Sequence, residues 1–135
     1  MQSPEVRRQD LVYPDLSYII VGCAYDVFNE LGGGLPEKFY QRGFAKIFEI
    51  KKIPFRQQVY FPLKIKGHVI AKTYFDFLVF EKVIVELKKD NKFSRSNIEQ
   101  VNSYLKISGL KLALLINFTS DGVVFRRLVN IEGKL

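Results

Sequence analysis

The sequence predicts an α/β domain in which a mixed sheet is flanked by helices, in the order helix, helix, three strands, helix and two strands. Apolar residues recur at helical spacing within residues 15–31, 36–53 and 96–108. Runs rich in β-branched and aromatic residues occupy 55–65, 73–87, 110–118 and 123–129. With 135 residues, 47% of them hydrophobic, the chain is long enough for one core and too short for a second.

The composition argues against several classes of protein. No apolar run is long enough to span a bilayer and residues 1–10 lack the core of a signal peptide, so we expect a cytoplasmic protein without a membrane partner. The single cysteine, Cys23, cannot form an internal disulfide. The only histidine, His68, lies in a turn-like segment, which argues against zinc sites and histidine triads. The net charge of +7 favours a polyanionic partner such as nucleic acid.

The first residues differ from the rest of the chain. Residues 1–14 are polar, contain two prolines and show no period, so we interpret them as a flexible arm. A single domain is then expected at 15–135. Arg7 and Arg8 of the arm could touch a phosphate backbone, although a solvated tail is the simpler interpretation.

Two helices follow the arm. Asp15 or Ser17 is expected to cap the first helix, which ends at the glycine run 32–34. Because no Gly-Lys-Ser/Thr follows these glycines, we interpret them as a helix terminator rather than a phosphate cradle. Pro36 then starts the second helix at its favoured first-turn position.

Glu37 lies in the first turn of this second helix. It shares one helical stripe with Tyr40, Gln41 and Phe44, so it points with the core side. The helix dipole alone would favour an acid at this position. Glu37 therefore does not indicate chemistry by itself.

The second half of the chain predicts a crossover unit. Ser96 and Glu99 are expected to form a capping box at the start of the third helix. Residues 110–118 form a nearly continuous apolar run, which is typical of a central strand covered on both faces. Because a helix separates this strand from the strand at 83–87, the two should run parallel through a right-handed connection.

Three ionisable residues, Asp76, Glu86 and Lys88, interrupt the central apolar hairpin. Such groups are rarely buried without partners, so their presence needs a reason. A two-residue turn would pair Asp76 with Leu87 and send the two acids to opposite faces. A three-residue loop at 80–82, or one bulge, pairs Asp76 with Glu86 instead, and we expect this register. Glu86 and Lys88 share a face in either case.

Two acids in this register would repel each other. At a separation of about 4 Å the repulsion is roughly 4 kcal/mol for an effective dielectric near 20. Lys88 would offset part of it, and a hard divalent cation held by carboxylate oxygens and a backbone carbonyl would offset the rest, as Mg²⁺ is usually bound. The alternative is a plain ion pair between Glu86 and Lys88 at a sheet edge, with Asp76 in a turn.

The element order and the D-x9-E-x-K pattern of the central hairpin resemble the PD-(D/E)XK nuclease superfamily. The segment GLPEKFY, Gly34–Tyr40, fits the motif of the GxxExxY family within it. VIVELK and SYLKISGLKLALLINF resemble the later blocks of that family, and the resemblance covers about residues 16 to 130. Phe75 stands where the superfamily name has proline, a change common in this branch. The resemblance implies a restriction-endonuclease-like core.

The resemblance also implies roles for the acids and their neighbours. Asp76 and Glu86 would hold Mg²⁺ or Mn²⁺ with help from the Leu87 carbonyl. Lys88 would orient the attacking water or stabilise the pentavalent transition state. Glu37 would complete the metal shell.

The third helix would contribute to the same site. Gln100 and Tyr104, four residues apart, fit the QxxxY pattern of exonuclease-like branches, where these side chains position the phosphate or the active-site lysine. Phosphodiester cleavage needs an activated water, neutralisation of developing charge and in-line positioning. All these residues can converge at one end of the sheet.

Basic residues would give this site a nucleic-acid substrate, DNA or RNA. We expect a phosphate backbone to follow Lys89, Lys92 and Arg95 after the catalytic strand. Lys72 and Tyr40 are expected as further contacts. Because the domain has no obvious recognition module, specificity is expected to come from a homodimer or a partner protein.

Two other functions stay open. A nucleic-acid-binding or partner-recruited module with the same fold but little activity would bind in a salt-sensitive manner, unaffected by EDTA, and would cut nothing. A structural or oligomeric protein with ordinary ion pairs would bind no metal, and Glu86→Gln would lower its stability.

Overall fold

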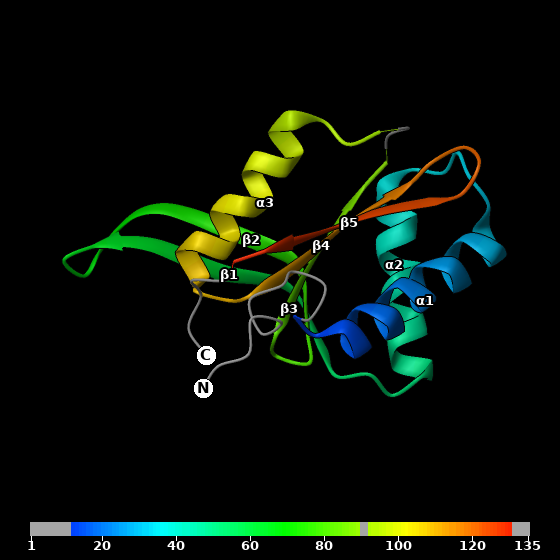
Figure 1. The fold of residues 1–135 in the computed structure, drawn as a ribbon, viewed down its shortest axis with the longest axis horizontal. Helices are drawn as coiled ribbons and strands as arrows, with labels where there is room; N and C mark the ends of the chain where they lie inside the picture. Colours follow the sequence, from blue (N-terminus) through cyan, green and yellow to red (C-terminus); the bar gives the residue numbers. More distant parts are fainter. Residues whose placement is uncertain (1–11, 90–91, 131–135) are drawn as a thin grey trace, which may run out of the picture.

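The computed structural model describes residues 12–89 and 92–130 of the chain. The elements are α1 (Pro14–Leu31), α2 (Glu37–Ile50), β1 (Phe55–Ile65), β2 (His68–Val79), β3 (Val83–Lys88), α3 (Arg95–Ser108), β4 (Leu112–Phe118) and β5 (Val123–Val129) (Figure 1). The predicted α/β class and element order are confirmed. Most of the predicted N-terminal arm, including Arg7 and Arg8, lies outside the described residues.

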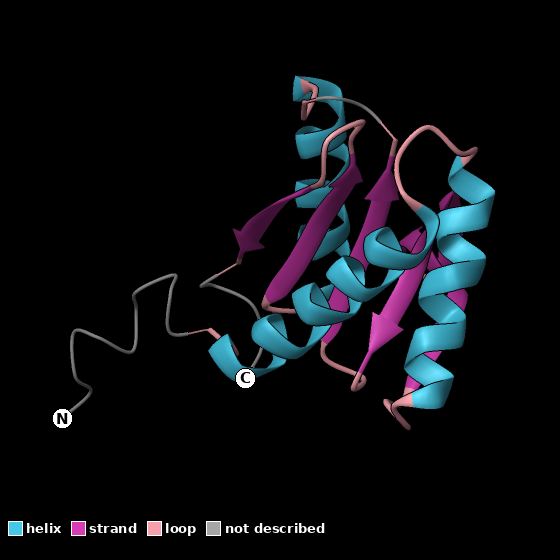
Figure 2. Cartoon of the chain, turned by 90° about the vertical axis from the view of Figure 1, so that its right-hand side faces the viewer, coloured by secondary structure: helices cyan, strands magenta, loops and turns pink. Residues whose placement is uncertain are grey.

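One mixed sheet forms the centre of the fold. Its strand order is β1-β2-β3-β4-β5. Neighbouring strands are antiparallel except β3 and β4, which run parallel because α3 carries the chain from one to the other. Helices α1 and α2 cover one face, and α3 covers the opposite face (Figure 2). No helix in the described part of the chain is long and apolar enough to cross a bilayer.

Each face of the sheet has its own apolar core. On the α1 and α2 face, Phe44 and Phe48 pack around Phe77, with ring centroids 5.8 and 5.6 Å away. The core on the α3 face is smaller and includes Ile84, Val101, Leu105 and Leu115. The inner strands are therefore shielded on both sides. An ionisable side chain in them reaches solvent only where neighbouring strands separate.

The helix starts differ slightly from the predictions. α1 begins at Pro14, and Ser17, one of its predicted caps, is buried inside the helix. Pro36 precedes α2 as its N-cap residue. The cap of α3 is Ser94 rather than Ser96, and its hydroxyl accepts a backbone N–H at 3.0 Å. Periodicity locates a helix, but its boundary depends on which nearby residue turns toward the backbone.

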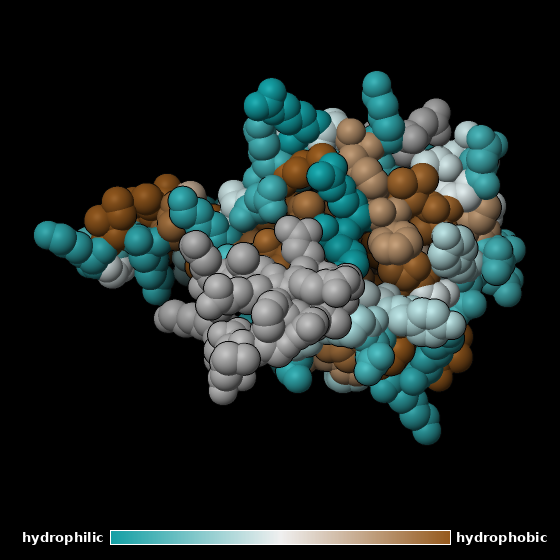
Figure 3. Space-filling model, viewed as in Figure 1, coloured by the Kyte–Doolittle hydropathy of each residue, from teal (hydrophilic) through white to brown (hydrophobic). Residues whose placement is uncertain are grey.

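The β1–β2 hairpin is much longer than β3 and extends away from the helices (Figure 1). It reverses through Lys66 and Gly67, both with positive φ, as a two-residue hairpin loop requires. Its outer end exposes Ile65, Val69 and Ile70. Figure 3 shows these apolar side chains gathered at the tip, flanked by hydrophilic ones.

Candidate active site

The register of the β2–β3 hairpin brings the two predicted acids together. Val79 pairs with Val83, so residues 80–82 form a three-residue loop. By the same register, Asp76 lies opposite Glu86. The expected register is therefore confirmed, and the two-residue turn is wrong.

At the acids, carboxylate oxygens replace the backbone ladder. The Asp76 N–H donates to Glu86 Oε1 at 2.7 Å, and the Leu87 N–H donates to Asp76 Oδ2 at 2.9 Å. Backbone pairing of β2 with β3 ends one residue earlier, at Phe77. The strands separate where the acids begin, and each carboxylate accepts a backbone N–H of the opposite strand.

β1 is distorted beside this pair. Its ladder with β2 skips Gln58, which lies opposite Asp76 and has a φ of 48°. This left-handed conformation is uncommon for a residue with a side chain and costs about 1–2 kcal/mol. Gln58, Asp76 and Glu86 therefore form one row across β1, β2 and β3.

β2 turns over at the same point. Phe75 packs in the core under α3, whereas Phe77 packs in the core under α1 and α2. Residues two apart on a regular strand share a face, so the alternation of β2 breaks between these phenylalanines. Asp76 is the residue at which the two faces of the strand exchange.

Burial raises the pKa of both acids, and repulsion from Asp76 raises that of Glu86 further. Glu86 is 3% exposed, and burial followed by repulsion from Asp76 raises its pKa to about 8. Burial also raises the pKa of Asp76, although the Leu87 N–H and the charge of Lys88 oppose this effect. At neutral pH the metal-free pair therefore retains a proton, which a bound cation would displace.

This pair has the chemistry that a hard divalent cation requires. Glu86 is buried and Asp76 is half-buried, and the charge of Asp76 opposes the ionisation of Glu86. The predicted third acid, Glu37, does not belong to the same cluster. Among residues 12–89 and 92–130, no three acidic, histidine or cysteine side chains are grouped closely enough to hold a metal. Glu37 instead marks the start of α2.

Lys88 and Tyr104 add a cation and a phenol to the pair. Lys88 is half-buried, and its charge lowers the pKa of both acids. Tyr104 is 7% exposed and packs on Phe75 with 5.1 Å between ring centroids. Burial and the two carboxylates raise the pKa of Tyr104 to about 12, so its hydroxyl keeps its proton. Gln100, one turn earlier on α3, lies exposed at the surface.

Most of the predicted nucleic-acid contacts lie at the surface. Four of them have exposed side chains: Lys72, Lys89, Lys92 and Arg95. The carbonyl of Lys92 accepts a hydrogen bond from the Asn117 amide at 3.2 Å, which ties the loop after β3 to the end of β4. Arg95 pairs with Glu99 at 3.0 Å, an exposed contact of small energy. Asp90 and Asn91 lie outside the described residues.

Tyr40 is the exception, because it is fully buried. Its ring stacks on Phe118 with 4.4 Å between centroids. Its hydroxyl donates to the Gly32 carbonyl at 2.6 Å and accepts the Leu35 N–H at 3.3 Å. The expected nucleic-acid contact is therefore corrected: Tyr40 ties the glycine loop to α2.

A cavity of about 230 Å³ lies between α2 and the β1–β2 hairpin, beside the acids. Asp76 and Phe77 line it together with polar and basic residues, namely Lys38, Gln41, Arg42, Gln57 and Gln58. The sequence patterns did not indicate this set. Only Gln41 could have been predicted, because it shares a helical stripe with Glu37. The positions of the others depend on how α2 packs over the distorted strand β1.

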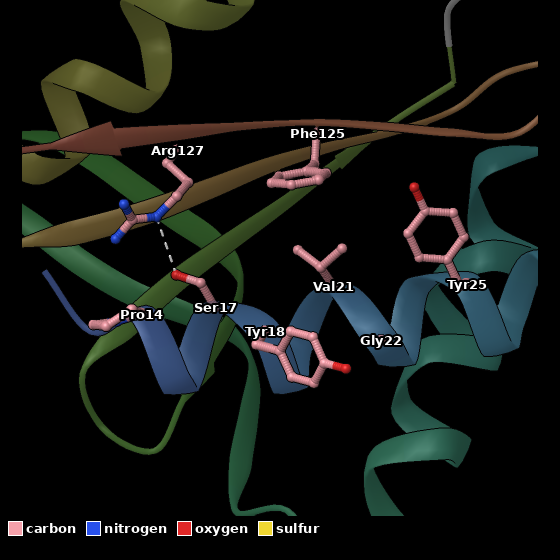
Figure 4. Close-up of a pocket in the computed structure, with 8 residues that line it drawn as sticks. All are labelled: Pro14, Ser17, Tyr18, Val21, Gly22, Tyr25, Phe125 and Arg127. Atoms are coloured by element: carbon pink, nitrogen blue, oxygen red, sulfur yellow. Dashed lines mark hydrogen bonds between the residues drawn. The ribbon is translucent and has the colours of Figure 1, made fainter. Parts of the chain in front are cut away.

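A larger cavity of about 450 Å³ lies between α1 and β5 (Figure 4). Tyr18 and Tyr25 extend from α1 beside it, and Phe125 faces them from β5. The Arg127 Nε–H donates to Ser17 Oγ at 3.2 Å at one end. None of the described residues that line this cavity is acidic, whereas Asp76 lines the smaller cavity.

Comparisons with known proteins bear on the family of the chain. The family model of the PD-(D/E)XK nuclease superfamily matches residues 14–128. No curated protein matches the chain.

Two solved structures share the fold. The crystal structure of SSO0001 is similar with a TM-score of 0.55 and 14% identity, over 94% of this chain and 62% of that one. The chain therefore spans less than two thirds of SSO0001. An alkaline exonuclease (LHK-Exo) from Laribacter hongkongensis is similar with a TM-score of 0.52 and 12% identity, over 93% of this chain and 76% of that one. With the family match over most of its length, the chain belongs to the PD-(D/E)XK nuclease superfamily.

Proposed function

We propose that this chain is a divalent-metal-dependent nuclease that hydrolyses phosphodiester bonds in DNA or RNA, in the GxxExxY branch of its superfamily. The observation that carries the proposal is the pair of acids, buried Glu86 and half-buried Asp76, beside Lys88 where the β2–β3 ladder ends. An ordinary ion pair would lower the pKa of its acid, whereas both acids here have a raised pKa. The match of residues 34–40 to the GxxExxY motif supports the branch.

Asp76, Glu86 and the Leu87 carbonyl would hold Mg²⁺ or Mn²⁺. These are hard oxygen ligands, which both ions prefer. Glu37 lies outside the acid cluster, so we assign it an indirect role at the start of α2, through a water of the metal shell. When bound, the ion lowers the pKa of a water and neutralises charge that develops on the phosphate.

The side chains around the acids would position the substrate. Lys88, whose charge acts on both carboxylates, would orient the attacking water or stabilise the pentavalent transition state. Tyr104 keeps its proton at physiological pH, so its hydroxyl can donate to a phosphate oxygen. Gln100 would contact the strand from the exposed edge of α3. The exposed cations expected along the phosphate backbone are Lys72, Lys89, Lys92 and Arg95.

Cleavage of labelled single- and double-stranded DNA and RNA, with Mg²⁺ or Mn²⁺, tests the proposal. The protein should cut at least one polymer, and EDTA should abolish cutting. Lys88→Ala should remove the activity. Lys82→Ala is the matched control, because Lys82 is an exposed lysine on the loop of the same hairpin, and it should cut normally. Cutting that survives Lys88→Ala, or no cutting of any substrate, would contradict the proposal.

A partner-recruited or nucleic-acid-binding module with little activity is the second candidate. The exposed apolar tip of the β1–β2 hairpin favours it, because Ile65, Val69 and Ile70 form a patch that a second copy or another protein could cover. Salt-sensitive binding that is unaffected by EDTA, without cleavage, would select this function.

A further inference from the structure

The cavity between α2 and the β1–β2 hairpin has no role in the chemistry assigned to the acids. Asp76 is one of its lining residues, so the cavity adjoins the proposed metal site. Its volume of about 230 Å³ is below the range of pockets that enclose drug-sized ligands. A phosphate with its sugar suits this space better than a whole base pair.

The charges of the lining favour an anion. Lys38 and Arg42 are four residues apart on α2, so they project on the same side of the helix into the lining. Both side chains are exposed, so a ligand can reach them. Asp76 is the only acid among the described lining residues, and a bound cation would neutralise it.

The strand side of the cavity adds uncharged donors. Gln57 and Gln58 line it from β1, and their side-chain amides carry N–H groups that suit phosphate oxygens. The left-handed φ of Gln58 interrupts the ladder at this position and places its side chain beside Asp76. An amide at this point can therefore touch both the acid and a neighbouring phosphate.

We propose that this cavity is a subsite for the sugar-phosphate backbone of the strand that is cut, with Lys38 and Arg42 as its cationic contacts. The inference rests on the proposed function, which places the scissile phosphate at Asp76 and Glu86. Helices α2 and α3 cover opposite faces of the sheet (Figure 2). The nucleic-acid strand would thus cross the β2–β3 hairpin at the end that carries the acids, from the subsite toward Lys89.

The test measures binding of short labelled DNA and RNA, single-stranded and duplex, in EDTA so that nothing is cut. Each lost phosphate contact lowers the slope of log affinity against log salt by about 0.7 for single strands and about 0.9 for duplex DNA. The double variant Lys38→Ala/Arg42→Ala should therefore lower the slope by about 1.4 to 1.8. Alanine favours helix, so the variant should fold, and thermal unfolding checks this.

A matched double variant controls for net charge. Lys46→Ala/Lys106→Ala also removes two cations, one paired with Glu49 on α2 and one in the last turn of α3. Its salt slope should change by less than half as much. Equal losses in the two variants, an unchanged slope in the first, or a wild-type protein that binds none of the probes would overturn the subsite. Failure of cleavage with the slope difference intact would overturn the nuclease and leave Lys38 and Arg42 as contacts of a bound strand that is not cut.

Discussion

The two ends of the β2–β3 hairpin are built from opposite kinds of contact. At the loop end, Val79 faces Val83, and both are fully buried within a regular ladder. At the other end, Asp76 faces Glu86, the ladder has ended, and the carboxylates bind backbone N–H groups instead. One register therefore serves packing at one end and a charged site at the other.

The stability of the site originates at the apolar end of the hairpin. Burying a valine contributes about 1.5–3 kcal/mol. Glu86 is buried and Asp76 is half-buried, and these two carboxylates with raised pKa values oppose folding when both are ionised. The acids can be held in a destabilising position because the apolar end specifies the register independently of them.

Substitutions at the two ends of the β2–β3 hairpin should affect different properties, activity at the acid end and stability at the apolar end. Asp76→Asn should lower metal-dependent cleavage by at least about 10³-fold, because a neutral amide replaces an anionic ligand. Val79→Ala, at the apolar end, should lower the free energy of unfolding by about 2 kcal/mol and leave the activity of folded molecules unchanged. Cleavage rates and denaturant unfolding of both variants check this. Equal loss of activity per folded molecule in the two variants would contradict this difference between the two ends.

The second prediction concerns pH in the absence of metal. The pKa of Glu86 is raised from 4.5 to about 8 in the folded protein, so the folded state holds this proton more tightly. Its contribution to stability is complete below about pH 4.5 and is lost as the pH rises through about 8. The free energy of unfolding in EDTA should fall by about 4 kcal/mol between these limits.

Glu86→Gln is the control for this pH dependence. It should flatten the profile and raise the stability of the metal-free protein at alkaline pH, because no charge remains to be buried. Mg²⁺ should stabilise the wild type at pH 8 and not the variant. An ion pair with Lys88 predicts the reverse, a loss of stability in Glu86→Gln, and that result would remove the acids from metal binding.

The third prediction concerns the position of the start of α2 relative to the acid end of the β2–β3 hairpin. A Cβ on Gly33 would lie 2.8 Å from the carbonyl oxygens of Thr119 and Ser120. Gly33→Ala should therefore cost about 2 kcal/mol and lower activity by displacing Glu37. Gly22→Ala, where a Cβ meets nothing within 4 Å, is the matched control and should be neutral or slightly stabilising. Thermal unfolding with cleavage rates distinguishes the two, and equal behaviour would contradict the close packing.

The fourth prediction concerns the strained backbone of Gln58 beside the acids. Gln58→Gly removes the amide and relieves the left-handed φ of 48°, so it should raise the free energy of unfolding by about 0.5–1 kcal/mol. Lys52→Gly relieves a similar φ of 58° far from the acids and should gain a similar amount. Only Gln58→Gly should weaken Mn²⁺ binding, measured by calorimetry, because it frees Asp76. Equal Mn²⁺ affinity in both variants would leave Gln58 without a role.

Much of the fold followed from local patterns. The periods of the apolar residues identified every helix and strand of the described chain, and the turn at 80–82 set the register that joins Asp76 to Glu86. Boundaries were less accurate, as Ser94 and Ser96 show, because two nearby hydroxyls could each cap α3.

The element order, the pairing of the acids and the excess of positive charge could be predicted before the fold was known, since they depend on residues close together in the chain. The burial of Tyr40, the separation of Glu37 from the acids and the place of Gln58 in their row became visible only in the folded chain. Those outcomes depend on how α2 packs on the sheet and where β1 and β2 turn over. Both are contacts between distant segments, for which spacing along the chain carries no signal.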